Sequence, residues 1–566
     1  MGQRSDLVTV ALTGQLAFTL VVAAVLSFLT SCLLLMLYRR AVIKSMRRRS
    51  QNDLLETKGF LPPEPETKQR DGALSLNFIS LDSHEINAGG AELYRHAIRR
   101  RWVIALIHSI AGIAFAATMT AAFLSAGKME FTPFRFIFLT WVNAWPVVIA
   151  ISLAVGLSRR GKLVASATYF AIGTVVMTIV LSKNPAVSLG QLLYIWLDTN
   201  LPPTLLLLVF LNRRIRAVGP LVLVFMILGV SGANLVVTLV GNNRTLLKAL
   251  SEFSSSIGLG AAGTMVLLHL IGFAAFAIVG WMILGTLRSL YELKRISEQS
   301  ITIDAVWLVF GIVNSIGLVF QGHLWIFGGV AAYVVYKFVA AGLFKLFGIA
   351  RRSQSSGRRL LLLRVFALGK RSEALYDKLG KSWRTVGSIQ MIAGPDLATS
   401  SIEPHEFLDF LTGKLDRRFI DSGRTLDLRI NQMDLRPDKE GQFRVTEFFC
   451  HDDTWKMSLA RLADESDVVL MDLRGFSPAN TGCIFEIKEL FNVVALSSLV
   501  FVIDDTTDQT FMHQTMQQAW REIKDRSPNH HLTTGKISLV GLSGMSHIGY
   551  HNLLYAVCAA ASNTPD

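Results

Sequence analysis

Residues 467–490 have the sequence DVVLMDLRGFSPANTGCIFEIKEL and determine the predicted fold of the C-terminal part of the chain. The run VVLM near the start is short and apolar, which predicts a buried strand. Gly475 and Pro478 then break the direction of the chain, and Asn480 or Thr481 can cap a helix that begins there. The stretch therefore predicts a strand, a polar loop and a helix in succession.

Glu486 lies in the first turns of this predicted helix, at the carboxyl edge of the predicted sheet. Open α/β sheets bind their ligands at that edge, so a carboxylate there is a candidate catalytic group. Acidic side chains are also common in the first turns of helices, because the helix dipole favours them. The stretch alone leaves both interpretations open.

The composition is that of a membrane protein. Of the 566 residues, 51% are hydrophobic and only 17% are charged, and several windows exceed the 18 apolar residues that can cross a bilayer. The net charge is +14, but it is distributed unevenly. Residues 351–566 contain 26 Lys and Arg and 27 Asp and Glu, whereas residues 1–350 contain 30 Lys and Arg and 15 Asp and Glu. This distribution is typical of basic loops between membrane spans and argues against a nucleic-acid partner.

The hydrophobic segments predict nine spans. Residues 7–38 form the first transmembrane anchor, residues 39–101 a cytoplasmic linker, and residues 102–345 a bundle of eight further spans. Basic loops alternate with loops of few cations, which places the N-terminus outside and the C-terminal domain in the cytoplasm of an inner (plasma) membrane. The eight spans are approximately 102–125, 134–157, 163–182, 189–211, 217–240, 258–286, 303–320 and 325–344.

Two of these spans carry polar residues next to proline. Asp198 and Asn200 precede a Pro-Pro pair in the span 189–211, and Pro146 follows Asn143 in the span 134–157. An acid and freed backbone carbonyls within a membrane indicate an ion or substrate site. Hydrogen bonds that fix one helix to another explain the same residues equally simply, and the role of Asp198 stays open.

After a short linker at residues 353–359, predicted strands and helices alternate along the chain. Such alternation predicts a parallel sheet covered by helices on both faces, a three-layer α/β domain over residues 360–566. The fold class is thus an α-helical polytopic membrane domain followed by a C-terminal α/β domain with a mainly parallel sheet. The predicted strands are 360–367, 389–393, 425–430, 443–449, 468–472, 499–503 and 537–542; the helices are 372–386, 404–420, 453–464, the helix that carries Glu486, 510–526 and 547–561.

Parts of this domain resemble a TIR domain. The strand LLRVF at 362–366, the motif CIFE at 483–486 and the strand at 499–505 carry the resemblance, which covers roughly residues 360–505. The segment is also similar to nucleoside deoxyribosyltransferase-like domains, which place a Glu after such a strand. The resemblance implies a TIR/flavodoxin-like fold.

Enzymatic TIR domains cleave the nicotinamide–ribose bond of NAD, and the resemblance assigns their catalytic role to Glu486. A carboxylate suits this chemistry because it stabilises the positive charge that develops on the ribose. The domain would be an NAD glycohydrolase, with NAD as substrate and no cofactor. No metal is expected, since His547 and His551 lack a third ligand nearby in sequence. The candidate substrate-binding residues are Asp472, Arg474, Ser477, Asn480 and Phe366.

The sequence therefore predicts a membrane-tethered signalling or effector protein whose cytoplasmic domain cleaves or binds a nucleotide, NAD above all. Its expected partners are the lipid bilayer, a nucleotide ligand and a second copy in a homo-oligomer. Many TIR domains are adaptors without catalysis, so a non-catalytic nucleotide- or protein-binding sensor is one alternative. A transporter with a regulatory cytoplasmic domain is another, and it would depend on Asp198.

Overall fold

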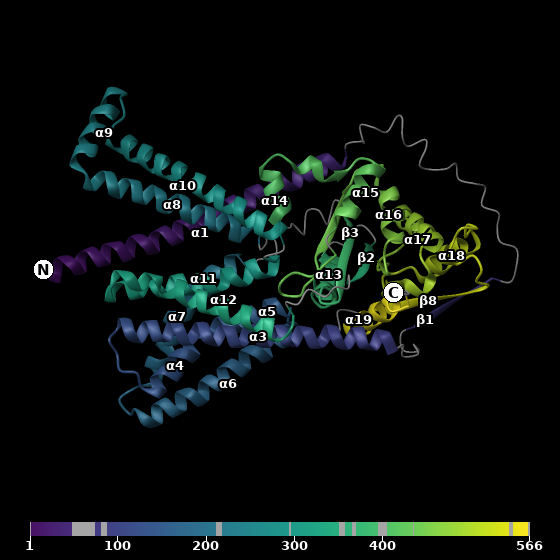
Figure 1. Ribbon diagram of the computed structural model, residues 1–566, viewed down its shortest axis with the longest axis horizontal. Helices are drawn as coiled ribbons and strands as arrows, with labels where there is room; N and C mark the ends of the chain where they lie inside the picture. Colours follow the sequence, from purple (N-terminus) through teal and green to yellow (C-terminus); the bar gives the residue numbers. More distant parts are fainter. Residues whose placement is uncertain are drawn as a thin grey trace. The chain divides into compact units, whose positions relative to one another are not determined.

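The computed structural model describes the chain except for residues 1, 48–73, 81–87, 211–214, 216–217, 294–295, 350–356, 365–369, 394–403, 434, 543–546 and 564–566. The chain forms two compact units. We call the first the membrane unit, Met1–Leu37, Ile104–Phe347 and Ile402–Leu408. The second is the sheet unit, Tyr38–Val103, Gly348–Ser401 and Asp409–Asp566. Figure 1 shows the helices and strands of both, with labels where there is room.

Long apolar helices make up the membrane unit. Among the described residues, eight helices are long and apolar enough to cross a bilayer, so the protein is a multi-pass membrane protein. The prediction of nine spans exceeds this number by one, because α7 is a 22-residue helix that is not among the eight. The helices are α1 (Gly2–Met46), α3 (Ala88–Ala126), α4 (Pro133–Asn143), α5 (Trp145–Ala154), α6 (Arg159–Lys183), α7 (Leu189–Phe210), α8 (Gly219–Asn242), α9 (Arg244–Ser256), α10 (Ala261–Glu292), α11 (Glu298–Leu318) and α12 (Gly328–Leu346), with short 3₁₀ turns at Val319–Gln321 and His323–Phe327.

The third predicted span, in which Pro146 follows Asn143, is broken between two helices. α4 ends at Asn143 and α5 begins at Trp145, within one span of 22 residues. Pro146 explains the position of the break, because proline has no N–H group with which to continue the helical hydrogen bonds.

The helix α9 differs from the prediction, because it occupies a segment between two predicted spans that was expected to be a loop. The Asn243 side chain caps this helix by accepting hydrogen bonds from two backbone N–H groups of its first turn.

The described residues of the sheet unit form eight strands in the order β1-β8-β7-β6-β2-β3-β5-β4, and every neighbouring pair is parallel. The prediction of a mainly parallel sheet is therefore confirmed. β6 is buried along its whole length, as expected of a strand covered on both faces. The strands are β1 (Ser75–Ser80), β2 (Arg358–Arg364), β3 (Gly387–Ala393), β4 (Phe419–Ile420), β5 (Val445–Cys450), β6 (Val468–Asp472), β7 (Leu499–Ile503) and β8 (Thr534–Gly541).

Helices cover both faces of the sheet, so the unit has three layers. Alternate residues of β2 enter different cores: Leu361 and Leu363 pack with α16, α17 and α18, whereas Leu360 and Leu362 pack with α13 and α19. This division follows from the two-residue period of a strand. The helices of the unit are α13 (Lys370–Trp383), α15 (Gly423–Gln432), α16 (Trp455–Asp464), α17 (Thr481–Val493), α18 (Gln509–Arg521) and α19 (His547–Ala561); the residues of α14 (Pro404–Leu411) are divided between the two units.

Two predicted elements were wrong. Residues 425–430, predicted as a strand, lie in the helix α15, which Ser422 caps by accepting a hydrogen bond from the Thr425 N–H. Residues 404–420, predicted as one helix, form α14, a 3₁₀ turn at Leu415–Arg418 and the short strand β4. Gly413, with φ 70°, lies between them in a conformation that ends a helix.

The predicted cytoplasmic linker supplies part of the sheet unit. β1 pairs with β8 from Ser75 opposite Thr534 to Ser80 opposite Leu539, and its Leu76 and Phe78 pack against the core. The first turns of α3 also pack on this unit, against the core beside α13 and α19. The Pro-rich part of the linker, residues 61–66, lies outside the described residues.

Candidate functional site

The candidate site lies where the strand order of the sheet reverses. From β2 the chain first adds β3 on one side, and β6 later joins β2 on the other side. The carboxyl ends of β2 and β6 therefore flank a topological switch point, which is where open α/β sheets bind ligands. Arg364 ends β2, Asp472 ends β6, and the two are register partners.

Glu486 faces the interior of the sheet unit from α17. The residue is only 3% exposed, so its side chain does not face solvent. Its Oε2 has no hydrogen-bond partner among the described residues. Burial raises the pKa of the carboxyl to about 8, and a hydrogen bond with Cys483 opposes this rise. At neutral pH Glu486 therefore holds a proton.

Tyr376 brings α13 into the same cluster. Its hydroxyl donates to the Leu363 carbonyl at 3.3 Å, and the ring packs in the core beneath the sheet edge. Burial, and next the charge of Asp472, hold the pKa of Tyr376 well above 10. The ionisable groups within electrostatic range of this phenol come from both strands that flank the switch point and from α17: Asp472, Arg364, Arg474 and Glu486.

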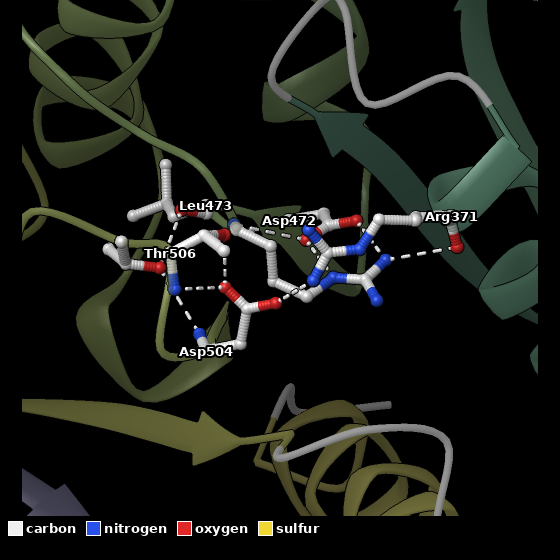
Figure 2. A network of polar contacts seen from close by, with 7 residues as sticks. Arg371, Asp472, Leu473, Asp504 and Thr506 are labelled. Atoms are coloured by element: carbon white, nitrogen blue, oxygen red, sulfur yellow. Dashed lines mark hydrogen bonds and ion pairs between the residues drawn. The ribbon is translucent and has the colours of Figure 1, made fainter.

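Asp472 and Arg474 form a bidentate ion pair with each other. Nε and one terminal nitrogen of the guanidinium lie 2.8 and 2.7 Å from the two carboxylate oxygens of Asp472, and both side chains are buried. Gly475, with φ 70°, allows the tight turn that folds Arg474 back onto the strand end. Both residues lie at the edge that the sequence predicts for substrate binding, but in this structure they bind each other. Figure 2 labels Asp472 within this network.

A second ion pair continues the network toward solvent. Arg371 at the start of α13 pairs with Asp504 at the end of β7, and the Arg371 carbonyl accepts a hydrogen bond from Arg474 at 3.3 Å (Figure 2). Thr506 donates twice to Asp504, from its N–H at 3.0 Å and its hydroxyl at 2.6 Å. Burial alone would raise the pKa of Asp504, but these hydrogen bonds and the charge of Arg371 lower it. The Arg371 side chain is 51% exposed and so reaches solvent.

Two further predicted site residues, Ser477 and Asn480, bond each other. Ser477 donates to the Asn480 Oδ1 from its N–H at 2.9 Å and from its hydroxyl at 3.0 Å. Asn480 occupies the predicted N-cap position of α17, but its side chain makes no capping hydrogen bond. Phe366 lies outside the described residues.

Sequence reasoning did not select Arg364, Tyr376 or Arg371 for the site. Tyr376 has the helical spacing of a core residue, and the two arginines resemble ordinary charges at the ends of elements. The one available signal was the polar ending of the apolar strand LLLLR, since Arg364 follows four buried leucines.

Metal ligands form no group of three or more within the part of the chain that the structure describes. His551 instead shares a 2.6 Å hydrogen bond with the Tyr94 hydroxyl. The side chain of His547 lies outside what the structure describes.

The membrane unit contains an ion pair that the sequence analysis did not find. The Lys337 ammonium on α12 lies 3.0 and 2.9 Å from the two carboxylate oxygens of Asp304 on α11. Asp198, which the sequence analysis singled out, is exposed on the surface of α7.

No protein-family model, curated protein or solved structure matches this chain. The chemistry of the site thus follows from its own geometry, namely a buried acid beside a sheet edge that carries three guanidinium groups.

Proposed function

We propose that this protein is a membrane-tethered signalling or effector protein whose TIR-like sheet unit cleaves the nicotinamide–ribose bond of NAD. One observation carries the proposal. Glu486 is a buried carboxyl with an unpartnered Oε2 among the described residues, in the helix that follows the switch-point strand β6. Burying an unpaired carboxyl costs free energy of folding, and acids with a strongly shifted pKa in such positions are typical of functional sites.

The raised pKa of Glu486 suits a cationic substrate. Without substrate, burial keeps the carboxyl protonated at neutral pH. The nicotinamide ring of NAD carries a positive charge, which favours the ionised form of a nearby acid, so binding would release the proton. The carboxylate then stabilises the positive charge on the ribose as the C–N bond breaks. Water adds to the anomeric carbon and loses its proton to the carboxylate, giving neutral nicotinamide and ADP-ribose.

The exposed guanidinium of Arg371 would bind the diphosphate of the same substrate. It lies in the network at the carboxyl edge of the sheet, and half of its side chain is open to solvent. A planar guanidinium pairs well with phosphate oxygens. An acid for the ribose and an arginine for the phosphates are the two features that a dinucleotide needs.

The test is release of nicotinamide from NAD by the full-length protein in detergent or nanodiscs. The full chain is needed because β1 and the first turns of α3 belong to the sheet unit. Glu486→Gln should lower the rate at least a hundredfold, whereas Glu489→Gln, three residues on in the same helix, should leave it within threefold. Release that is equal in wild type and Glu486→Gln contradicts catalysis by this residue.

A second candidate is a sensor that binds the nucleotide without cleaving it. The Asp472–Arg474 ion pair favours this function, because the charges of these two side chains at the sheet edge already neutralise each other and neither is left for catalysis. A sensor predicts saturable NAD binding by calorimetry together with no nicotinamide in the product mixture. Turnover that depends on Glu486 would exclude it.

The basic loops support an orientation with the sheet unit in the cytoplasm and the N-terminus outside. NAD is then available to the site. Labelling of single cysteines placed at the N-terminus and in the sheet unit, with a reagent that does not cross the membrane, tests this orientation in whole cells. Labelling of the sheet unit from outside would contradict it.

A further inference from the structure

The helix α9 joins two spans of the membrane unit, α8 and α10, that pack closely on each other. A Cβ on Gly272 would lie 2.6 Å from the Gly232 carbonyl oxygen, and one on Gly280 would lie 2.9 Å from the Phe225 ring. The two helices are therefore antiparallel. Counting outward from the Gly232–Gly272 contact brings the end of α8 level with the start of α10.

Both ends of α9 are held close to these two spans. The single residue Asn243 separates α9 from α8. At the other end the Leu259 N–H donates to the Ser254 carbonyl at 2.8 Å, and Gly258 has φ 74°, so the chain turns tightly before α10 begins at Ala261. α9 therefore stays at the level where α8 ends and α10 begins, and Figure 1 shows it across the ends of the two spans.

α9 has one apolar face and one charged face. Leu246, Leu250 and Phe253 recur at intervals of three or four residues, which places them on the same side of a helix. Lys248 and Glu252 lie on the opposite side, one turn apart, with the ammonium 4.0 Å from the carboxylate. Both of these charged side chains are mostly exposed, so the charged face is turned to water.

The described part of the chain leaves most of the apolar face uncovered. Leu246, Leu247, Phe253 and Ile257 are 51, 47, 55 and 52% exposed. Ser254 is buried, so α9 packs on the rest of the membrane unit along only one edge. An exposed apolar face beside a charged one indicates contact with a partner other than water.

The uncharged surface of the two spans extends to α9. Residues 217–243 and 253–287 contain no Asp, Glu, Lys or Arg. Leu239 near the end of α8 and Val266 near the start of α10 are 58 and 59% exposed, as expected of side chains that face lipid. The charges of α9 therefore mark the boundary between the hydrocarbon and the headgroups. Amphipathic helices at this boundary lie in the plane of the interface.

We propose that α9 binds the surface of the bilayer, with Leu246 and Phe253 against the acyl chains and with Lys248 and Glu252 in water. The partner is lipid because α9 is joined directly, at both ends, to spans that already contact lipid. The opposite charges of Lys248 and Glu252 offset each other, so binding needs no anionic lipid. This contact is independent of nucleotide chemistry in the sheet unit.

The experiment places the fluorophore NBD at single cysteines of the full-length protein in phosphatidylcholine nanodiscs. Cys32→Ser removes the exposed native cysteine, and the other three cysteines are buried. Phe253→Cys carries the label on the apolar face, and Ser251→Cys carries it on the opposite, exposed face as the matched control. A nitroxide on the acyl chain close to the headgroup reports contact with the interface.

We expect this nitroxide to quench the label at position 253 at least about threefold more than the label at position 251. The reason is that the apolar face of such a helix lies about 5–10 Å into the boundary between headgroups and acyl chains. Iodide in the aqueous phase should show the reverse order. Leu246→Cys lies on the same face as Phe253→Cys and should give the same result, and it replaces that variant should the latter not fold.

Weak and equal quenching by the nitroxide at both positions, with both labels open to iodide, means that α9 lies in water and overturns the proposal. Stronger quenching at position 253 by a nitroxide at the end of the acyl chain means that the helix inserts deeply, and this also contradicts it. A label at position 253 that neither lipid nor iodide quenches means that protein, such as a second copy of the chain, covers the face, and this overturns the proposal as well.

Discussion

Glu486 should make the stability of the sheet unit depend on pH. In the unfolded chain its carboxyl titrates near the ordinary value of 4.5, and in the folded protein burial raises the pKa to about 8. Between these values the folded state holds a proton that the unfolded state has lost, so the free energy of unfolding falls as pH rises. Each pH unit in this window costs about 1.4 kcal/mol, which sums to about 5 kcal/mol by pH 8.

The perturbation is Glu486→Gln, which keeps the shape of the side chain and removes its titration. The variant should match the wild type near pH 4.5 and become progressively more stable relative to it up to about pH 8. This stabilisation would accompany the loss of activity predicted above, as expected for a residue whose burial serves function rather than folding.

Chemical unfolding of the full-length protein measures the effect. Trp383 and Trp520 are buried in the sheet unit, so their fluorescence reports its unfolding. Glu489→Gln is the matched control and should follow the wild-type pH profile. Parallel profiles for the wild type and Glu486→Gln would show that the carboxyl is ionised in the folded protein, and would refute the reasoning from burial.

Three further predictions concern the sheet unit. Asp472→Asn or Arg474→Gln alone should lower the free energy of unfolding by about 3–5 kcal/mol, and the double variant by less than the sum; additive losses would contradict the pair. Gly475→Ala should lower the free energy of unfolding by about 1–2 kcal/mol, because Gly475 has a positive φ. Gly482→Ala should leave stability unchanged or raise it, because Gly482 is helical and a Cβ there meets open space. Equal effects of the two substitutions would contradict this prediction. Phe78→Asp should release β1, seen as faster amide exchange in β8; unchanged exchange would contradict the pairing.

Local patterns predicted the elements around Glu486 closely. β7 and α19 have the predicted bounds, and β6 and α17 begin where the apolar run and the cap position place them. These elements are either short buried strands or helices with clear start signals, so nearby residues determine them. Glu486 itself could be placed on its helix, but its burial depends on how α17 packs, which no local pattern shows.

Most of the features that the sequence analysis did not predict depend on contacts between residues that are distant in the chain. Arg371 and Asp504 are 133 residues apart in the chain and meet only because β2 and β7 lie in one sheet. The strand predicted at 425–430 alternates apolar and polar residues, yet the Ser422 cap and the packing of Leu426 and Ile430 on the core select a helix. Tertiary packing here overrides a short ambiguous pattern.

In the membrane unit too, local patterns predicted the helices but not the contacts between distant residues. Hydropathy finds the apolar helices because the bilayer sets their length, and Pro146 marks the break after Asn143. The Asp304–Lys337 pair was missed because the two residues belong to different helices, and neither alone distinguishes a partly buried ion pair from a charge near a loop.

The position of β1 has a consequence for synthesis of the protein. Ser75 and its partner Thr534 are 459 residues apart in the chain. At about 5–20 residues per second, the ribosome needs roughly 25–90 s to deliver the second strand after the first. All helices from α3 to α12 are synthesised within that interval, so β1 has no partner strand until translation is almost complete.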